Sequence, residues 1–252
     1  MTESDDHRLA HDLAAATGAV LLEVRRRFTA PDGSTRDQTA MKDAGDQEAH
    51  DLIMRRLTAA RPDDAILSEE GADDLARLGA VRTWIVDPLD GTREFSEPPR
   101  DDWAVHIALV IDGQPVVGAV ALPALGVTLS TATPPVLGPP SLSAPRVIVS
   151  RTRRPQAAVD LAAALDAHYI EMGSAGAKAM AVVQGQADIY AHSGGQYEWD
   201  NCAPVAVARA AGLHCSRLDG SPLVYNNENP YLPDLLICRA EWAERSLDIL
   251  NR

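Results

Sequence analysis

The segment Trp84-Ile85-Val86-Asp87-Pro88-Leu89-Asp90-Gly91-Thr92 is the most informative stretch of this chain. Its apolar start predicts a short buried strand that ends in Asp87. Pro88 has no backbone N–H, so we expect the strand to stop there and a turn to follow. Such a turn can bring the carboxylates of Asp87 and Asp90, and the Leu89 carbonyl between them, to one point. Hard cations such as Mg²⁺ prefer oxygen ligands of this kind.

The end of the same segment predicts a second kind of site. Gly91 and Thr92 open a short helix, and free N–H groups at a helix start favour an anion such as phosphate. A purely structural interpretation stays open, in which Asp87 and Asp90 cap a turn and Thr92 caps a helix.

A second acidic strand end lies close by in the sequence. The apolar run Ala65-Ile66-Leu67 predicts another buried strand, and Ser68-Glu69-Glu70 follows it directly. If the two strands are neighbours, Glu69 and Asp87 would repel each other unless a cation lay between them. A solvated loop is the alternative, and we expect it for Glu70 more than for Glu69.

Two helix starts in the second half of the chain contribute further candidates. Asp200, in Glu198-Trp199-Asp200, is either the N-cap of the apolar helix that follows or a metal ligand that reaches across a cleft. The segment from Gly173 to Lys178 offers free amides, the Ser174 hydroxyl and a lysine, which suit a second phosphate or a ribose. Small residues that let a helix pack closely on a sheet are the alternative there.

The histidines and serines form no recognisable catalytic set. His106 lies in an apolar strand pattern, which favours a hydrogen-bonded core histidine over a catalyst. His192 and His214 are isolated and match no metal-binding motif, and Ser150 and Ser193 lack the nucleophile elbow of an α/β-hydrolase.

The composition limits the partners of the chain. Its 252 residues include 23 Lys+Arg against 36 Asp+Glu, which gives a formal net charge of −13. This excess of acid argues against long nucleic acids and anionic membrane surfaces, because both are bound by Lys and Arg. The acidic N-terminus does not resemble a signal peptide, and the apolar run from Val116 to Val127 is too short to span a bilayer. Three widely spaced cysteines indicate reduced thiols in a cytoplasmic protein.

Hydrophobic periodicity predicts two lobes, residues 1–138 and 139–252, which meet across a cleft. Five prolines between Pro134 and Pro145 predict a linker. The dipeptide Asp112-Gly113 predicts a hairpin turn. Helices are expected at residues 7–28, 46–60, 155–167, 175–185, 201–211 and the C-terminus. Strands are expected at residues 65–67, 84–86, 104–110, 116–122, 127–131, 146–150, 169–172, 187–191 and 234–238.

Taken together, these motifs resemble those of the inositol monophosphatase superfamily of lithium-sensitive, Mg²⁺-dependent phosphatases. The resemblance rests on Asp87 to Thr92, Ser68 to Glu70 and Trp199-Asp200, and it extends to Gly45-Asp46-Gln47 and Gly185 to Asp188. Within the superfamily the chain is similar to the CysQ-type branch, especially its actinobacterial members. That branch comprises 3′(2′),5′-bisphosphate nucleotidases, which hydrolyse 3′-phosphoadenosine 5′-phosphate to AMP in sulfur assimilation.

The resemblance implies an α+β fold, a layered αβαβα sandwich of the inositol monophosphatase and fructose-1,6-bisphosphatase type, with the active site between its lobes. It also implies two or three Mg²⁺ ions in each site. Glu69, Asp87 and the Leu89 carbonyl would hold one ion. Asp87, Asp90 and Asp200 would hold a second, so that Asp87 bridges the two.

The resemblance also assigns the catalytic and substrate contacts. Asp46 and Thr92 would orient and deprotonate the attacking water, so that a metal-activated water hydrolyses the phosphate monoester directly. The amides of Gly91 and Thr92 would bind the scissile phosphate, with Ser174 and Lys178 on the substrate side. The segment Gly-Ser-Ala-Gly-Ala-Lys is one residue longer here than the Gly-Ser-Ser-x-Lys of many members.

Two other functions stay open at this point. An inositol-1-phosphate or fructose-1,6-bisphosphate phosphatase would share the core motifs and differ only at the rim of the cleft. A non-catalytic cation-binding protein would not need Thr92 or Asp46, and both are present. The expected partner is therefore a small phosphorylated substrate, a nucleoside bisphosphate or a sugar phosphate. Members of the superfamily are often dimers, so a homodimer is also expected.

Overall fold

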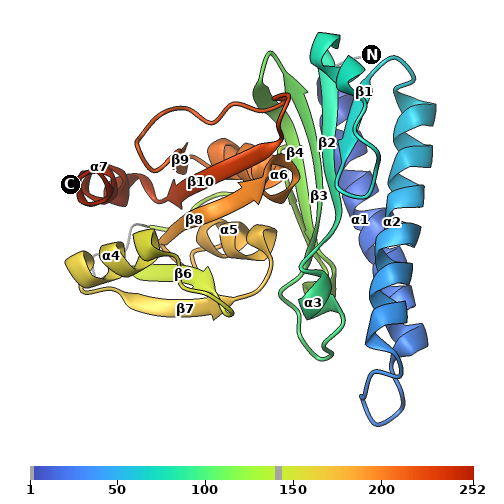
Figure 1. Ribbon diagram of the computed structural model, residues 1–252, viewed down its shortest axis with the longest axis horizontal. Coiled ribbons are helices and arrows are strands. Elements are labelled where there is room, and N and C mark those ends of the chain that lie inside the picture. Colours follow the sequence, from blue (N-terminus) through green and yellow to red (C-terminus); the bar gives the residue numbers. More distant parts are fainter. Residues whose placement is uncertain (1–2, 140–143) are drawn as a thin grey trace.

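The computed structural model describes residues 3–139 and 144–252 of the chain. In these residues two five-stranded sheets alternate with helices to form five layers (Figure 1). Helices α1 and α2 cover the outer face of the first sheet, α5 and α6 lie between the sheets, and α4 and α7 cover the outer face of the second. The expected α+β class and the layered αβαβα sandwich are confirmed.

The outer layer of the first sheet consists of α1 (Glu3–Phe28) and α2 (Gln38–Ala60). The prediction for α2 was wrong at its start, because the helix begins eight residues before position 46. The Asp37 carboxylate accepts the Ala40 N–H at 3.0 Å and so caps the helix. Gly45 lies inside the helix, where a Cβ would come within 2.8 Å of Phe95 Cε1.

The first sheet has the strand order β1-β2-β3-β4-β5. Strand β1 runs parallel to β2, and the later neighbours are antiparallel. Asp112 and Gly113 form the predicted hairpin turn, both with positive φ angles (51° and 72°). The strands of this sheet are β1 (Ala65–Ser68), β2 (Arg82–Asp90), β3 (Ala104–Ile111), β4 (Gln114–Leu122) and β5 (Val127–Ser130).

Strand β2 does not end at Pro88, so this prediction was also wrong. The register shifts between Asp87, which pairs with His106, and Asp90, which pairs with Ala104. Two residues of β2 therefore lie opposite one residue of β3, which is a β-bulge, and a bulge tolerates the missing N–H of proline. Side chains three positions apart normally point to opposite faces of a strand. The extra residue lets Asp87 and Asp90 point to the same side.

The second sheet has the strand order β7-β6-β8-β10-β9, and β6 runs parallel to both β7 and β8. Strand β8 is longer than predicted, because it continues antiparallel to β10 as far as Tyr197. The short strand β9 was not predicted. The strands of this sheet are β6 (Arg146–Ser150), β7 (His168–Met172), β8 (Ile189–Tyr197), β9 (His214–Ser216) and β10 (Tyr231–Cys238).

The remaining helices include one that begins earlier than predicted. Helix α6 starts at Glu198 instead of Asn201, which places Asp200 in its first turn. None of the helices in the described part of the chain is both long and apolar enough to cross a membrane. The remaining helices are α3 (Thr92–Phe95), α4 (Gln156–Leu165), α5 (Ala175–Val183), α6 (Glu198–Ala210) and α7 (Ala240–Leu250), with short 3₁₀ helices at Leu75–Gly79 and Pro123–Leu125.

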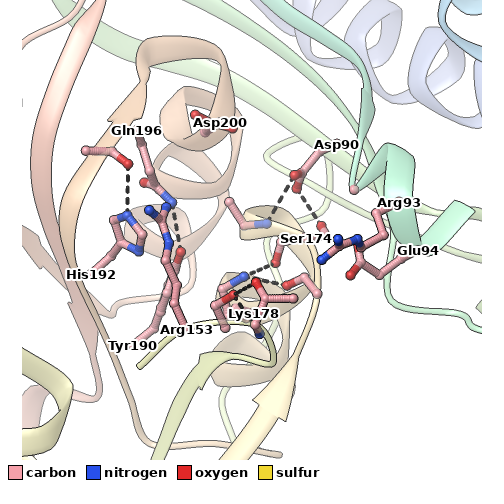
Figure 2. Close-up of a pocket in the computed structure, with 16 residues that line it drawn as sticks. Asp90, Arg93, Glu94, Arg153, Ser174, Lys178, Tyr190, His192, Gln196 and Asp200 are labelled. Carbon is pink, nitrogen blue, oxygen red and sulfur yellow. Dashed lines mark hydrogen bonds between the residues drawn. The ribbon is translucent and has the colours of Figure 1, made fainter. Parts of the chain in front are cut away.

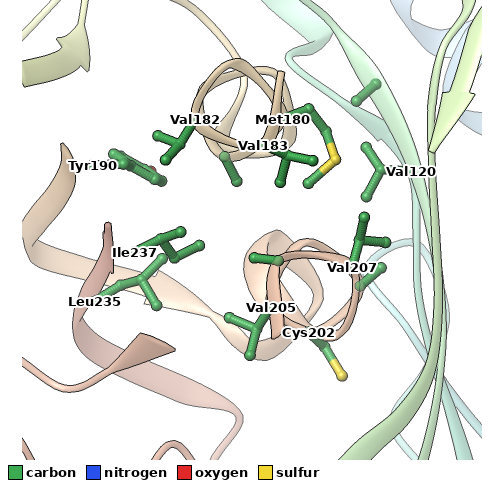
Figure 3. Packing of buried hydrophobic residues seen from close by; sticks show 14 of the residues in the cluster. Val120, Met180, Val182, Val183, Tyr190, Cys202, Val205, Val207, Leu235 and Ile237 are labelled. Atoms are coloured by element: carbon green, nitrogen blue, oxygen red, sulfur yellow. The ribbon is translucent and has the colours of Figure 1, made fainter. Parts of the chain in front are cut away.

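Three hydrophobic clusters lie between the layers and join each sheet to the helices packed on it. The central cluster joins Val120 of the first sheet to Met180 of α5, Val207 of α6 and Ile237 of the second sheet (Figure 3). It contains residues from both sides of the proposed boundary at 138/139, which itself stays a prediction. Of the proline-rich linker, residues 134–139 form no helix or strand, and residues 140–143 lie outside the described residues.

Gly118 provides a test of the packing between the first sheet and α6. A Cβ at this position would lie 2.5 Å from Ala206 Cβ and 2.8 Å from the Ala203 carbonyl oxygen. Gly118→Ala should therefore lower the free energy of unfolding by about 1–3 kcal/mol, measured by urea denaturation. Gly79→Ala is the matched control, because a Cβ there meets nothing within 4 Å. Equal stability of the two variants would show that the sheet and helix do not pack this closely.

Candidate active site

Three carboxylates converge where the first sheet meets the central helices. Asp87 and Asp90 come from β2 and Asp200 from the first turn of α6, and their ligand atoms lie within 4.8 Å of one another. Asp87 and Asp90 are 1% and 7% exposed. Buried carboxylates this close repel one another unless protons or a cation intervene, and an all-oxygen donor set suits a hard divalent cation. The residues present therefore fit a magnesium-type site.

Glu69 adds a fourth carboxylate to this group. Its N–H donates to the Val86 carbonyl at 3.3 Å, which continues the parallel pairing of β1 with β2 and brings Glu69 beside Asp87. Partial removal from water, together with the charges of Asp200 and Asp90, raises the pKa of Glu69 to about 7. The two strands are neighbours, which is the condition under which Glu69 and Asp87 lie side by side. Glu69 and Glu70 are both exposed, so the solvated loop that was expected mainly for Glu70 includes Glu69 as well.

The pKa values of Asp87 and Asp200 report the same crowding. Burial, followed by the charges of Glu69 and Asp90, raises the pKa of Asp87 well above its ordinary value. Burial and the charge of Asp90 raise the pKa of Asp200 to about 6. Asp200 also accepts the Tyr197 N–H at 2.6 Å, so it helps to cap α6 while it faces the other carboxylates. The capping and metal-ligand interpretations of Asp200 are therefore compatible.

Asp90 differs from its neighbours because donors surround it. It accepts hydrogen bonds from the Ser174 hydroxyl (2.5 Å), the Gly176 N–H (2.6 Å) and the Ala175 N–H (3.1 Å). Burial alone would raise the pKa of Asp90, but His106, Ser174 and Gly176 together lower it to about 2. Oδ2 receives two of these bonds and Oδ1 receives one, so Oδ1 keeps a lone pair for a cation.

The start of α5 does not offer the free amides that the sequence predicted. The N–H groups of Ala175 and Gly176 donate to Asp90, and the Ala177 N–H donates to the Ser174 hydroxyl oxygen. Buried Lys178 donates to the carbonyl oxygens of Gly173 and Ser174. Gly173, Ser174, Ala175 and Lys178 line the adjoining cavity, but the polar groups at the start of α5 already have partners within the protein. Burial lowers the pKa of Lys178 to about 8.

Gly91 occupies a position that only glycine suits. Its φ angle is 87°, and a Cβ there would lie 3.1 Å from Ser174 Cβ and 3.3 Å from Trp103 Cβ. Thr92 follows as the first residue of α3, so its N–H has no acceptor within the helix. This tight turn places the Gly91–Thr92 peptide at the edge of the cavity beside Asp90.

Asp46 and Thr92, a pair expected from the family resemblance, also meet. Asp46 lies on α2, where burial and the charges of Glu70 and Asp43 raise its pKa to about 7. The neighbouring Thr92 hydroxyl partly opposes that rise. The Thr92 hydroxyl donates its hydrogen to the Leu89 carbonyl oxygen at 3.2 Å. A carboxyl group with a pKa near neutrality, paired with a hydroxyl, can act as a general base.

The sequence analysis assigned His106 to the core and did not predict its contact with the acidic site. The residue is fully buried, and its Nδ1 donates to the Trp199 carbonyl at 3.0 Å, so the expected core histidine is confirmed. Its Nε2, however, lies 3.2 Å from Asp90 Oδ2. Burial alone would lower the pKa of His106, but Asp90 raises it above its ordinary value. The contact depends on the pairing of β3 with β2, which puts His106 opposite Asp87 and which the sequence analysis did not predict.

Other polar residues around the site were also missed. Asp102 accepts the Gly173 N–H, and Arg151 pairs with Glu94 at 2.6 Å, so both connect the two halves of the chain. Neither pair has a local sequence signature, because the partners lie 71 and 57 positions apart.

A cavity of about 390 Å³ adjoins these residues. Figure 2 shows Asp90 and Asp200 above Lys178. Arg153, Tyr190 and His192 also line the cavity and lie to the left of Lys178 in this view. His192 and Ser150, which the sequence left without a role, both line this cavity, whereas His214 does not. The volume lies in the range of small-molecule sites. Burial lowers the pKa of His192 to about 4, so it is neutral at pH 7.

The chain is similar to proteins of a known family. The model of the inositol monophosphatase family matches residues 4–249. The 3′-phosphoadenosine 5′-phosphate phosphatase of Mycobacterium bovis is 53% identical over 237 residues, which cover 90% of this chain and 86% of that protein. The protein of the same name from Mycobacterium leprae is 48% identical and covers 99% of this chain and 94% of its own length.

More distant relatives agree in sequence and in structure. The 3′(2′),5′-bisphosphate nucleotidase CysQ of Escherichia coli is 30% identical, covering 87% of this chain and 94% of that protein. The crystal structure of CysQ from Bacteroides thetaiotaomicron has a TM-score of 0.77 at 25% identity and covers 94% of this chain and 98% of that one. On these grounds, the chain belongs to the inositol monophosphatase family.

Proposed function

We propose that this protein hydrolyses 3′-phosphoadenosine 5′-phosphate to AMP and phosphate, and that Mg²⁺ is its metal. The observation that carries the proposal is the convergence of Asp87, Asp90 and Asp200 beside the Asp46–Thr92 pair, at the edge of a cavity of about 390 Å³. Relatives of 48–53% identity that bear the name of this activity support the choice of substrate.

The proposed metal ligands come from the family resemblance, and the convergence of Asp87, Asp90 and Asp200 supports them. Glu69, Asp87 and the Leu89 carbonyl would hold one ion, and Asp87, Asp90 and Asp200 another. When bound, the ions would offset the charge of the carboxylates, lower the pKa of a water molecule and stabilise the leaving oxygen. From the family resemblance we also propose that the site holds two or three ions and that lithium inhibits the enzyme.

Asp46 and Thr92 would handle the attacking water. In the reaction the Thr92 hydroxyl would turn its hydrogen from the Leu89 carbonyl to Asp46. Its oxygen lone pairs would then accept a hydrogen from water, which would fix the orientation of the water. Asp46 is suited to receive the proton, because its pKa of about 7 matches neutral pH. No serine or cysteine nucleophile is required for such a direct hydrolysis.

The substrate phosphate would lie against the amides of Gly91 and Thr92. We assign Ser174 and Lys178, whose polar atoms are already bonded to Asp90 and to backbone carbonyls, to the substrate side of the cavity, where they shape its wall. Arg93 and Arg153 also line the cavity and supply positive charge beside the acidic site. An acidic protein can thus admit a small polyanion.

The wider setting is part of the same proposal. Removal of 3′-phosphoadenosine 5′-phosphate places the enzyme in sulfur assimilation. A cytoplasmic location suits cysteines that are unpaired, as Cys202, Cys215 and Cys238 are. The two lobes, residues 1–138 and 139–252, and a homodimer stay predictions.

A comparison of substrates tests the choice of activity. With Mg²⁺ present, kcat/KM should be highest for 3′-phosphoadenosine 5′-phosphate and lower for inositol-1-phosphate and fructose-1,6-bisphosphate. Phosphate release from each compound, with EDTA as the control, measures the ranking. A higher value for either sugar phosphate would reassign the substrate, and no release from any compound would favour a non-catalytic cation-binding protein.

The role of Asp46 is tested by Asp46→Asn. Loss of the general base should lower kcat by about 10²–10⁴-fold, while the Mg²⁺ concentration for half-maximal activity stays nearly unchanged. Asp51→Asn, at an exposed position of the same helix, is the matched control and should retain activity. Full activity of the Asp46 variant would remove Asp46 from the reaction.

The crowded carboxylates predict how stability depends on pH and on Mg²⁺. The folded-state pKa values of Glu69 and Asp200, about 7 and 6, lie above their ordinary values, so folding favours their protonated forms. In EDTA, the melting temperature should therefore fall as the pH rises from about 4 to 8. Added Mg²⁺ should raise the melting temperature more at pH 8 than at pH 5, because protons compete with the metal. Asp90→Asn should abolish most of this response, and an undiminished response would contradict the metal assignment.

A further inference from the structure

His106 connects four elements around the acidic site. We propose that it is a positioning residue that fixes the Asp90 carboxylate of β2 relative to the first turn of α6, which carries Asp200. The inference rests on the proposed metal site, and it adds a residue that neither the motifs nor the family resemblance singled out.

The two ring nitrogens contact different elements. Nδ1 lies 3.0 Å from the Trp199 carbonyl oxygen, which can only accept, so this nitrogen carries a hydrogen and donates it. Nε2 lies 3.2 Å from Asp90 Oδ2, which is an ion-pair distance, although the geometry is not that of a hydrogen bond. The side chain is 0% exposed, so water does not compete for either contact.

The imidazole is also held by close packing. A Cβ at position 176 would come 2.0 Å from His106 Nε2, so the start of α5 lies directly against the ring. Gly176 in turn donates its N–H to Asp90 at 2.6 Å. His106 therefore contacts residues of β2, α5 and α6 from its own strand, β3. The charged groups nearest the ring are Asp90, Asp87 and Asp200, with Asp87 Oδ2 at 3.9 Å from Nδ1.

This arrangement can set the separation of two metal ligands. Trp199 precedes Asp200 directly, so a hydrogen bond that holds the Trp199 carbonyl also holds the backbone from which the Asp200 carboxylate projects. Mg²⁺ requires near-octahedral geometry with oxygen distances of about 2.0–2.1 Å. Residues that orient metal ligands typically contribute about 10–100-fold to metal affinity.

The two contacts can be separated by substitution. The amide nitrogen of asparagine can take the place of Nδ1, and that of glutamine the place of Nε2. His106→Asn should keep the bond to Trp199, and His106→Gln should keep the contact with Asp90. His106→Leu should keep neither.

Mg²⁺ affinity, measured by isothermal titration calorimetry, is the main readout. We expect His106→Leu to weaken Mg²⁺ binding by about 10–100-fold and the Asn and Gln variants to weaken it less. In each variant, the loss of turnover relative to the wild-type protein should be smaller at saturating Mg²⁺ than at low Mg²⁺. Should the Leu variant fail to fold, the two polar variants alone give the result, since wild-type affinity in both would overturn the proposal.

Val105→Ala is the matched control. Val105 is equally buried in the same strand but belongs to the cluster on the opposite face of the sheet. It should lower stability without changing Mg²⁺ affinity. If His106→Leu behaves like Val105→Ala, the histidine is only structural. If Asp90→Asn also leaves Mg²⁺ affinity unchanged, the proposed metal site itself fails, which is a distinct outcome.

Discussion

Electrostatic repulsion among buried carboxylates is the constraint on which this structure depends. Asp87, Asp90 and Asp200 bring their oxygens within 4.8 Å of one another, and Glu69 adjoins them. In a low-dielectric interior, such a group is costly unless donors, protons or a cation offset the charge. The protein supplies donors to Asp90 and leaves the other carboxylates with raised pKa values. Because the other carboxylates lack such donors, a divalent cation is suited to offset their negative charge.

The same groups connect the two halves of the chain. Asp90 on the first sheet accepts hydrogen bonds from Ser174 and Gly176 at the start of α5, and His106 reaches the Trp199 carbonyl of α6. The central hydrophobic cluster surrounds these polar contacts with side chains from both sheets. The site is therefore built at the place where the layers are held together, and its geometry depends on the packing of the whole molecule.

Local patterns predicted much of this correctly. The apolar runs before Ser68 and Asp87 are strands, and Asp87 and Asp90 belong to the cluster of carboxylates. The errors lay where local rules compete with tertiary contacts. Pro88 was taken as the end of a strand, but a bulge accommodates it. The helix at residues 46–60 was expected to start after Gly45, but Gly45 lies inside it, where the close approach of Phe95 leaves no room for a side chain.

The amino-acid sequence alone was enough to identify the motif residues and most of the strands, because hydrophobic periodicity and the chemistry of Asp, Gly and Pro are local properties. The layered α+β class came from the family resemblance of those motifs. The three-dimensional arrangement was needed to show that the amides at the start of α5 donate to Asp90 and that His106 lies against the same carboxylate. Both contacts join residues that are far apart in the chain, over 80 positions in the case of Ser174 and Asp90. Only the packing of β2, β3, α5 and α6 against one another brings them within hydrogen-bonding distance.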